Sequence, residues 1–468
     1  MKKIINNIIK ILVLIINIIF IYYLIKINII PTLYLSVIIG IIIILDVISW
    51  FLLSRGKICL IIGYILLLIN LAVSSVGIYY TFTTDNFFSS LEEVKEQQLY
   101  CVVVKKDSDY NELKDLDNKS MAIFENQSAS YKKALNEVKD SIKVNEENYT
   151  NTNDIVSDLL NDEVDSLLIN SNNKELLDEN VTSFKDNTKI IAELSIDVEN
   201  KFEEQAEEYE TENGSFNVLI SGIDTSGNIN KVSRSDVNIV VSVNPNTHKI
   251  LLTSIQRDMY VQLHGTTGTK DKLTHAGIYG IDMSRQTIED FLDIDIPYYI
   301  RVNFDSVVNL VDTIGGVDIY NDVAFRGGSR YFEQGNIHLN GKQALEYARE
   351  RKKMPNGDWT RGEHQKVIIT AIINKVTNSR ELLTNYGDIL SNSQDLIQTN
   401  IPTDLIKEFV KDQLDSMSSW DISSTYVAGT SSDYRETYSM PGMNLYVTYP
   451  DENSVKNVSK QINDLLSE

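Results

Sequence analysis

The chain has 468 residues, enough for more than one folding unit, and its 43 basic and 65 acidic side chains give a net charge of −22. Charge of that sign repels a polyanionic duplex, so nucleic acid is a poor partner. The only two cysteines, Cys59 in an apolar run and Cys101, exclude a disulfide framework and a cysteine-rich metal site, and the apolar N-terminus excludes a simple cytosolic enzyme.

Three apolar stretches begin the chain, and each has the roughly 20 residues that a membrane-spanning helix needs. They are Ile8–Ile25, Thr32–Leu53 and Ile58–Tyr80. Basic residues precede the first stretch and recur between the second and third, so the positive-inside rule predicts a cytoplasmic N-terminus. Three crossings then place everything after Thr84 outside the cytoplasm of a multi-pass cell-membrane protein.

Polar residues inside these stretches need an explanation. Asp46 is either a functional contact for a lipid or partner, or a hydrated group near the cytoplasmic end of its helix, and we favour the second interpretation. Asn17 and Asn70 can form hydrogen bonds between helices, which is a structural role.

Residues 85–212 predict a small α/β unit. Short β-branched runs alternate with segments of helical spacing, and no ligand-binding motif is visible among them. Residues 201–214 are acidic and polar, which is typical of a linker or a solvated helix. We interpret the unit as a spacer or docking module.

The next segment contains three predicted strands, each with charged residues at one end: 216–223, 237–243 and 250–255. If the second and third strands are antiparallel, Asp236 at the start of one lies near Arg257 at the end of the other. Asp224 joins them if the first strand runs parallel to the third. Surface salt bridges or turn contacts explain any one of these residues alone, but their clustering indicates a site.

A second polar cluster follows at two predicted helices. Arg349 and Arg351 are two positions apart, so they converge only if their helix ends near Arg349. Arg361 and Gln365 share one face near a helix N-terminus, which favours anions. Together with Arg257, these arginines suit bidentate recognition of phosphate, and the neighbouring acids suggest Mg²⁺.

At these residues the sequence resembles the LytR–CpsA–Psr family. The matching blocks are Gly222–Asp224, Arg234–Asp236, Ser254–Asp258, Lys272–Ala276, Val311–Asp318, Leu339–Ala344, Tyr347–Arg351 and Asp358–Gln365. The resemblance implies a three-layer α/β catalytic domain with a mixed central sheet. We therefore divide the chain into a three-helix transmembrane anchor (1–84), an extracytoplasmic accessory α/β domain with an acidic linker (85–212) and the catalytic domain (213–468).

The resemblance also implies an activity in a Gram-positive type of envelope. The expected enzyme is a phosphotransferase that moves a phosphoglycopolymer from a polyprenyl-pyrophosphate carrier to peptidoglycan. The polymer is either teichoic acid or a capsular or surface polysaccharide. Two alternatives remain open: a hydrolase of the lipid pyrophosphate, and a membrane-bound envelope regulator or attenuator without catalysis.

The likeness assigns expected roles to individual side chains. Asp224 and Asp236 would hold Mg²⁺, and Asp358 or Asp224 would help to deprotonate the acceptor hydroxyl. The expected catalytic residues are Asp224, Asp236, Arg257 and Asp358. The expected pyrophosphate-binding residues are Arg257, Lys272, Arg349, Arg351, Arg361 and Gln365.

Three positions depart from the usual family pattern. Gln256 stands in place of Pro, Thr274 in place of Asn, and His364 in place of Arg. We expect the first two to be tolerated and the third to remove a positive charge that could bind pyrophosphate. The lipid tail needs an apolar groove. Candidates for its lining are apolar residues within 291–308 and the helix 367–373, although ordinary core packing explains each of them.

Overall fold

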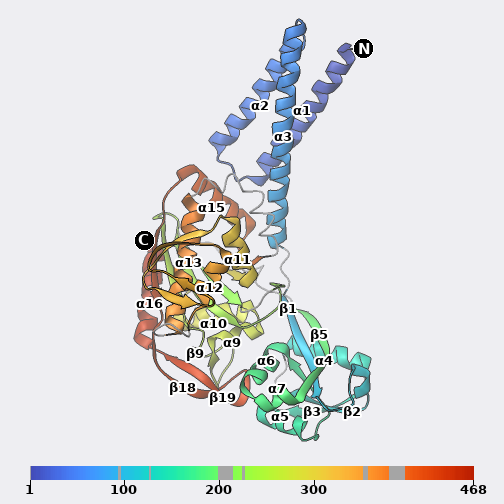
Figure 1. The fold of residues 1–468 in the computed structure, drawn as a ribbon, viewed down its shortest axis with the longest axis vertical. Helices are drawn as coiled ribbons and strands as arrows, with labels where there is room; N and C mark the ends of the chain where they lie inside the picture. The colour runs from blue at the N-terminus through green and yellow to red at the C-terminus, as the bar shows by residue number, and fades with distance from the viewer. Residues whose placement is uncertain are drawn as a thin grey trace.

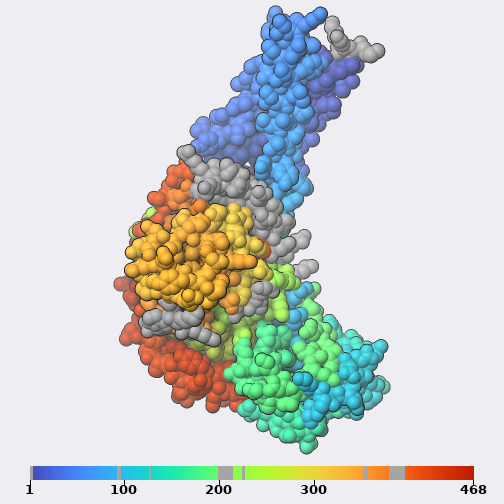
Figure 2. All heavy atoms as spheres, viewed as in Figure 1, coloured from blue at the N-terminus to red at the C-terminus, as the bar shows by residue number. Residues whose placement is uncertain are grey.

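The computed structural model describes the backbone of residues 2–92, 96–125, 128–198, 214–223, 227–351, 357–378 and 396–468. Within these ranges, three long helices form a rod that projects from two globular units (Figure 1). The space-filling view shows that the unit containing the C-terminus lies next to the rod, and that the second unit lies at the end of the molecule away from it (Figure 2).

The rod consists of α1 (Lys2–Ile27), α2 (Thr32–Leu52) and α3 (Lys57–Glu92). Each helix is long and apolar enough to cross a membrane, which confirms the three predicted spans in length and composition. α3 continues to Glu92, so the expected end of the anchor at Thr84 lies inside a helix.

A buried polar cluster joins the three helices of the rod. Asp46 of α2 is 8% exposed and accepts hydrogen bonds from Asn17 Nδ2 of α1 (2.8 Å) and Asn70 Nδ2 of α3 (2.9 Å). Ser74 Oγ donates to Asn17 Oδ1 at 2.6 Å. The interpretation of Asp46 as a hydrated group is therefore wrong, whereas the interhelical role of Asn17 and Asn70 is confirmed.

The unit away from the rod is built on a five-stranded sheet in the order β3-β2-β4-β1-β5. Its strands are β1 (Glu96–Lys105), β2 (Lys119–Phe124), β3 (Val144–Tyr149), β4 (Ser166–Asn170) and β5 (Thr188–Val198). Its helices are α4 (Ala129–Ser141), α5 (Thr152–Leu160), α6 (Ser171–Asn180) and α7 (Thr182–Asn187). The predicted α/β character is confirmed, and the expected boundary at 212/213 lies outside the described residues.

The unit next to the rod contains a six-stranded sheet in the order β16-β11-β6-β7-β8-β17. Its strands are β6 (Phe216–Ile223), β7 (Ser235–Asn244), β8 (Lys249–Ile255), β11 (Tyr298–Val302), β16 (Ile397–Thr399) and β17 (Asp421–Tyr426). The strand pairs β6/β7, β7/β8 and β11/β16 are antiparallel, whereas β11/β6 and β8/β17 are parallel. The predicted mixed central sheet is therefore confirmed.

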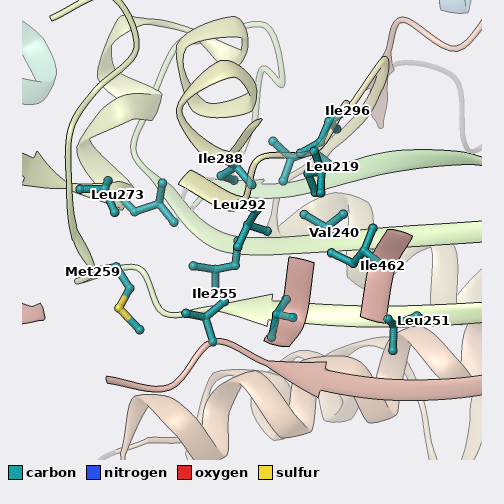
Figure 3. Close-up of a cluster of buried hydrophobic side chains, with 14 of the residues drawn as sticks. Leu219, Val240, Leu251, Ile255, Met259, Leu273, Ile288, Leu292, Ile296 and Ile462 are labelled. Atoms are coloured by element: carbon teal, nitrogen blue, oxygen red, sulfur yellow. The ribbon is translucent and has the colours of Figure 1, made fainter. Parts of the chain in front are cut away.

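Helices cover both faces of this sheet and complete three layers. One face packs against α9 (Leu273–Ala276), α10 (Ile281–Leu292) and α16 (Glu452–Ser467) in one continuous apolar core (Figure 3). The other face turns toward α11 (Phe304–Thr313), α12 (Gly341–Arg349), α13 (Asp358–Asn378) and α15 (Thr403–Ser416). We call these the packed face and the open face.

Short strand pairs lie outside the central sheet. They are β9 (Tyr260–Val261) with β10 (Asp271–Lys272), β12 (Val317–Asn321) with β15 (Gly335–Leu339), β13 (Phe325–Gly327) with β14 (Arg330–Phe332), and β18 (Gly429–Thr437) with β19 (Met440–Pro450). The strand β19 extends the unit toward the five-stranded domain, where Met440 and Leu445 join its apolar core.

Buried contacts connect all three parts of the chain. Glu96, the first residue of β1, is 3% exposed and receives a hydrogen bond from Arg301 Nη1 of β11 at 2.6 Å. At the rod, Phe88 and Leu91 of α3 pack with Ile406 and Val410 of α15. The six-stranded unit is therefore in contact with both the anchor and the five-stranded domain.

Candidate functional site

A cavity of about 850 Å³ lies between the open face of the sheet and the helices α11, α12 and α13. Most of its wall is apolar: Val218, Ile220, Val241, Val243, Ile250, Ile300, Val302, Phe304, Val307, Leu310, Ile368, Ile369, Ile372, Ile373 and Ile397. Charged and polar side chains gather in the remainder: Asp236, Arg257, Glu346, Arg349, Glu350, Arg351, Arg361 and Gln365. The cavity therefore suits an amphiphile with an anionic head and a long apolar tail.

An ion pair lies at the polar part of the cavity. Because β7 and β8 are antiparallel, Arg257 Nη1 donates to Asp236 Oδ2 at 2.7 Å, as the strand pattern predicts. Thr274 Oγ1 donates to Asp236 Oδ1 at 2.9 Å. Burial alone would raise the pKa of Asp236, but Arg257, Arg361 and these hydrogen bonds hold it below its ordinary value. Asp236 is thus a carboxylate at neutral pH.

The first turns of α13 supply two more polar groups. Arg361 and Gln365 lie one turn apart and both line the cavity, as their spacing predicts. Arg361 Nη2 lies 3.4 Å from the backbone oxygen of Asp236 and also contributes to lowering the pKa of that residue. The helix N-terminus thus brings a guanidinium to the same point as β7 and β8.

The end of α12 brings in the remaining arginines. The helix ends at Arg349, so Arg349 and Arg351 both reach the cavity, as expected from an end at that position. The guanidinium carbon of Arg349 lies 3.9 Å from the ring centroid of Phe304, a cation–π contact that fixes its position. Four arginines from three distant segments therefore line one cavity.

Lys272 is placed differently from the arginines. Its Nζ lies 2.5 Å from Asp258 Oδ1, and Lys272 does not line the cavity in the described part of the chain. Asp258 Oδ2 lies 3.7 Å from Arg257 Nε. Lys272 is therefore connected to Arg257 only indirectly, through Asp258. Its expected pyrophosphate contact stays a prediction.

Two expected catalytic residues are not described at the side chain. Asp224 lies outside the described residues, immediately after Ile223, which ends β6 and lines the cavity. Asp358 begins α13, but only its backbone is described. Their expected roles stay predictions.

Asp236 is a carboxylate suited to a divalent ion beside Arg257 and Arg361. No group of three His, Cys, Asp or Glu side chains that could hold a metal occurs among the described residues. Each oxygen of Asp236 accepts one hydrogen bond within the described part of the chain, which leaves lone pairs for a cation. Mg²⁺ needs only one or two carboxylates when phosphate and water complete its shell, so this donor set fits it.

The three departures from the family pattern have different surroundings. Thr274 bonds to Asp236, and Gln256 lines a small hollow next to it. His364 is 7% exposed, stacks on Phe325 with 4.8 Å between the ring centroids, and has Nδ1 3.0 Å from the backbone oxygen of Tyr347. His364 thus faces an apolar cluster and is not among the described residues that line the cavity, while its expected effect on pyrophosphate binding stays a prediction.

The expected apolar groove was only partly located from sequence. Ile300, Phe304 and Val307 line the cavity, as do Ile368, Ile369, Ile372 and Ile373. Leu292, Ile294 and Ile296 lie in the packed-face core instead. These three residues precede β11, at the end of α10 and in the connection that follows it. Within β11 the faces alternate, so Tyr299 lies in the core and Ile300 lines the cavity.

One ion pair close to the site was not predicted from the sequence. Arg234, two residues before Asp236, donates from Nη1 and Nη2 to the two carboxylate oxygens of Glu179 on α6, at 2.9 and 2.8 Å. The hydrogen bond from Arg234 holds the pKa of Glu179 below its ordinary value. The five-stranded domain therefore contacts the edge of the site, and no local sequence signal links residues 55 positions apart.

Comparisons with known proteins agree on one family. The profile of the LytR_cpsA_psr family matches residues 179–464. A polyisoprenyl-teichoic acid–peptidoglycan teichoic acid transferase TagU of Bacillus cereus (strain AH820) is 39% identical over 201 residues, which cover 43% of this chain and 65% of the relative. The TagU of Bacillus licheniformis is 34% identical over 256 residues, covering 54% of this chain and 78% of the relative.

A solved structure is also similar to this chain. The crystal structure of B. subtilis TagV is 30% identical, with a TM-score of 0.46, and the match covers 55% of this chain and 99% of that one. The chain thus spans slightly less than two thirds of the length of the first TagU relatives, at 65%, and nearly all of the TagV chain.

Proposed function

Because this chain belongs to the LytR_cpsA_psr family, we propose that it transfers a phosphate-linked glycopolymer from a polyprenyl-pyrophosphate carrier to peptidoglycan. The observation that supports this most directly is the cavity of about 850 Å³, which is apolar along most of its wall and carries four arginines at its polar part. A polyprenyl chain would occupy the apolar part, and its diphosphate would meet the guanidinium groups.

The proposed reaction is a phosphoryl transfer. The acceptor hydroxyl oxygen forms a bond to the phosphorus that carries the glycopolymer, and the bond from that phosphorus to the bridging oxygen breaks. Polyprenyl phosphate leaves, and the hydroxyl proton passes to a carboxylate, for which Asp224 and Asp358 are the candidates. Such a reaction needs mainly positioning and neutralisation of charge, which Arg257, Arg361 and their neighbours would provide.

Asp236 would be one ligand of Mg²⁺ and Asp224 the second. When bound, the ion would neutralise charge on the diphosphate oxygens. Asp236 suits this role because its pKa is held below the ordinary value, which keeps the carboxylate ionised. Arg257 and Thr274 would hold the carboxylate in one orientation through their bonds to its two oxygens.

The proposed location is the outer face of the cell membrane. Lys10 at the start of the rod and Arg55 and Lys57 between α2 and α3 favour a cytoplasmic N-terminus. Three crossings would then leave both globular units outside, where peptidoglycan is assembled. Teichoic acid and capsular or surface polysaccharide are both consistent with the site, since the cavity would hold the carrier rather than the polymer.

The test uses the full chain in lipid nanodiscs with a polyprenyl-diphosphate-linked glycopolymer, Mg²⁺ and peptidoglycan fragments. We expect the wild type to release polyprenyl phosphate and to attach polymer to the fragments, and Asp236→Asn to reduce both rates by about 10²–10³-fold. Asp290→Asn is the matched control, because Asp290 is an exposed carboxylate that contacts His264.

The outcome separates three functions. Attachment that depends on Asp236 supports the transferase. Release of polyprenyl phosphate at the same rate without peptidoglycan fragments, and with no attachment, would show a hydrolase. A folded wild type that turns over no substrate would contradict both enzymatic functions and favour a regulator.

A further inference from the structure

A second, smaller hollow adjoins the polar part of the large cavity. The two share Asp236, Arg257, Arg361 and Gln365 as wall residues. The rest of the small hollow is formed by Asn238, Ser254, Ile255, Gln256, Trp359, Gly362, Tyr426 and Val427. Its volume is about 20 Å³, which exceeds the roughly 10–15 Å³ that one water-sized group needs.

The strand order places the two hollows on different sides of the shared residues. The large cavity extends from β7 and β8 toward β6, β11 and β16, because Ile220, Ile300 and Ile397 line it. The small hollow extends from β7 and β8 the other way, to the end of β17 at Tyr426. The polar cluster therefore lies between an apolar cavity and a hollow of a different character.

An aromatic pair forms one wall of the small hollow. The rings of Trp359 and Tyr426 meet edge to face, with 5.7 Å between their centroids. Tyr426 is 40% exposed, so it offers a ring surface to a ligand. Lys366 contacts this pair: its Nζ donates to the backbone oxygen of Thr425 at 2.9 Å and lies 5.8 Å from the Tyr426 ring centroid.

Trp359 also carries an unsatisfied polar group. Its Nε1 is buried and has no hydrogen-bond partner among the described residues. A buried donor without an acceptor costs about 1–3 kcal/mol, so such groups usually find a partner in a bound molecule or water. A ligand oxygen seated in the hollow beside Trp359 would be a partner of this kind.

The reaction itself limits what the small hollow can bind. In phosphoryl transfer, the attacking and leaving oxygens lie roughly in line on opposite sides of the phosphorus. The leaving polyprenyl phosphate would extend into the large cavity, so the attacking hydroxyl has to approach from the opposite side. The small hollow is the candidate for that side, because it adjoins the large cavity at the shared polar residues and extends from them toward β17.

We infer that the small hollow and the exposed Tyr426 ring on its wall form the acceptor subsite: the hollow has room for the attacking hydroxyl, and Trp359 and Tyr426 hold the sugar ring that carries it. Aromatic rings present an apolar face to the C–H groups of a sugar, while the amide of Gln256 and the Trp359 N–H supply polar partners at its edge. This inference rests on the proposed transferase and adds to it the residues that select a glycan acceptor.

The experiment compares Trp359→Ala and Tyr426→Ala with the wild type in the nanodisc assay. We expect KM for a soluble peptidoglycan glycan fragment to rise about tenfold, with KM for the lipid-linked donor unchanged. Tyr426→Phe should retain wild-type KM, because it keeps the ring. Tyr320→Ala is the matched control, since Tyr320 is 58% exposed on a strand outside both hollows.

A binding measurement makes the test independent of turnover. Titration of the same glycan fragment into the full chain should show affinity that is weakened by both alanine variants, while binding of polyprenyl diphosphate stays at the wild-type level. Variants with wild-type acceptor KM and affinity, or with weakened donor binding alone, would overturn the subsite. A wild type that transfers no polymer would instead contradict the proposed function.

Discussion

The two faces of the six-stranded sheet differ in how they are filled, although their side chains are of the same kind. Val240 and Val241 are neighbours on β7 and point to opposite faces. Val240 lies on the packed face, is 0% exposed and packs with Leu219, Leu251 and the helices α10 and α16 (Figure 3). Val241 lies on the open face and lines the cavity of about 850 Å³.

The difference indicates what each face is for. Protein interiors are normally close-packed, and a sheet face that its own helices leave unfilled forgoes dispersion contacts. The packed face therefore contributes mainly to stability, whereas the open face combines a smaller buried cluster with the cavity that would hold the proposed lipid. Five experiments test this contrast.

The largest effect is expected from a buried ion pair on the packed face. Arg301 is 1% exposed and bonds to Glu96, so Arg301→Met leaves a buried carboxylate without its partner. We expect a loss of about 3–5 kcal/mol in the free energy of unfolding, measured by chemical denaturation. Lys105→Met, which breaks an ion pair with the exposed Asp162, should cost less than about 1 kcal/mol. Equal losses in the two variants would contradict the contrast.

The open face should respond in activity rather than stability. Arg257→Ala removes a charge that lowers the pKa of Asp236, and we expect transfer to fall about 10²–10³-fold. Without Arg257, the effect of burial is less opposed, so the pKa of Asp236 in the variant is higher than in the wild type. The residual activity should therefore begin to fall at a higher pH on acidification. The pH–rate profile measures this shift. Arg435→Ala serves as the control, because Arg435 is an exposed arginine that pairs with Asp433. An unshifted pH–rate profile for Arg257→Ala would contradict a role for the Arg257–Asp236 pair.

The neighbouring valines give a matched pair for the contrast itself. Val240→Phe overfills the packed face, and we expect it to lower the free energy of unfolding by about 1–3 kcal/mol. Val241→Phe projects into the cavity, so its stability should change by less, while binding of polyprenyl diphosphate should weaken. Denaturation and lipid-binding titrations measure the two effects, and the opposite pattern would reverse the assignment of the faces.

Titration of Asp282 on α10 gives a pH test of the packed face. Burial, with a smaller contribution from Glu96, raises the pKa of Asp282 to about 7. A carboxyl with a raised pKa favours the folded state most at low pH, so this contribution is lost as the pH rises from about 4 to 7. Asp282→Asn should remove this dependence and increase stability at pH 8 by about 1–2 kcal/mol. Thermal unfolding at pH 5 and 8 measures it, and an unchanged slope would show that Asp282 is not buried in solution.

The smallest effect is expected where the five-stranded domain meets the site. Glu179→Gln weakens the bidentate pair with Arg234, whose members are partly exposed, so stability should fall by only about 0.2–1 kcal/mol. Transfer activity should fall less than threefold. Glu175→Gln on the same helix is the control, and a loss as large as that of Arg257→Ala would mean that Glu179 belongs to the catalytic machinery.

The sequence allowed the local geometry of the site to be predicted where one element determines it. The spacing required antiparallel strands around Asp236 and Arg257 and a helix end at Arg349 if these side chains were to meet, and the structure confirms both. The contact of Glu96 with Arg301 joins residues 205 positions apart, which no local pattern encodes. Likewise, Val240 and Val241 have identical chemistry, so only the helices that cover each face decide which residue meets a cavity.

The length of α3 has a consequence for the lipid substrate. Its 36 residues span about 54 Å, whereas the hydrocarbon core of a bilayer is about 30 Å thick. The C-terminal part of α3 packs against α15 through Phe88 and Leu91, which joins the six-stranded unit to the end of this helix. If α3 crosses the membrane as proposed, the unit would lie outside the hydrocarbon core. Under the proposed function, a carrier lipid would have to leave the bilayer partly in order to react, and the cavity lined by isoleucine and valine would then take up its tail.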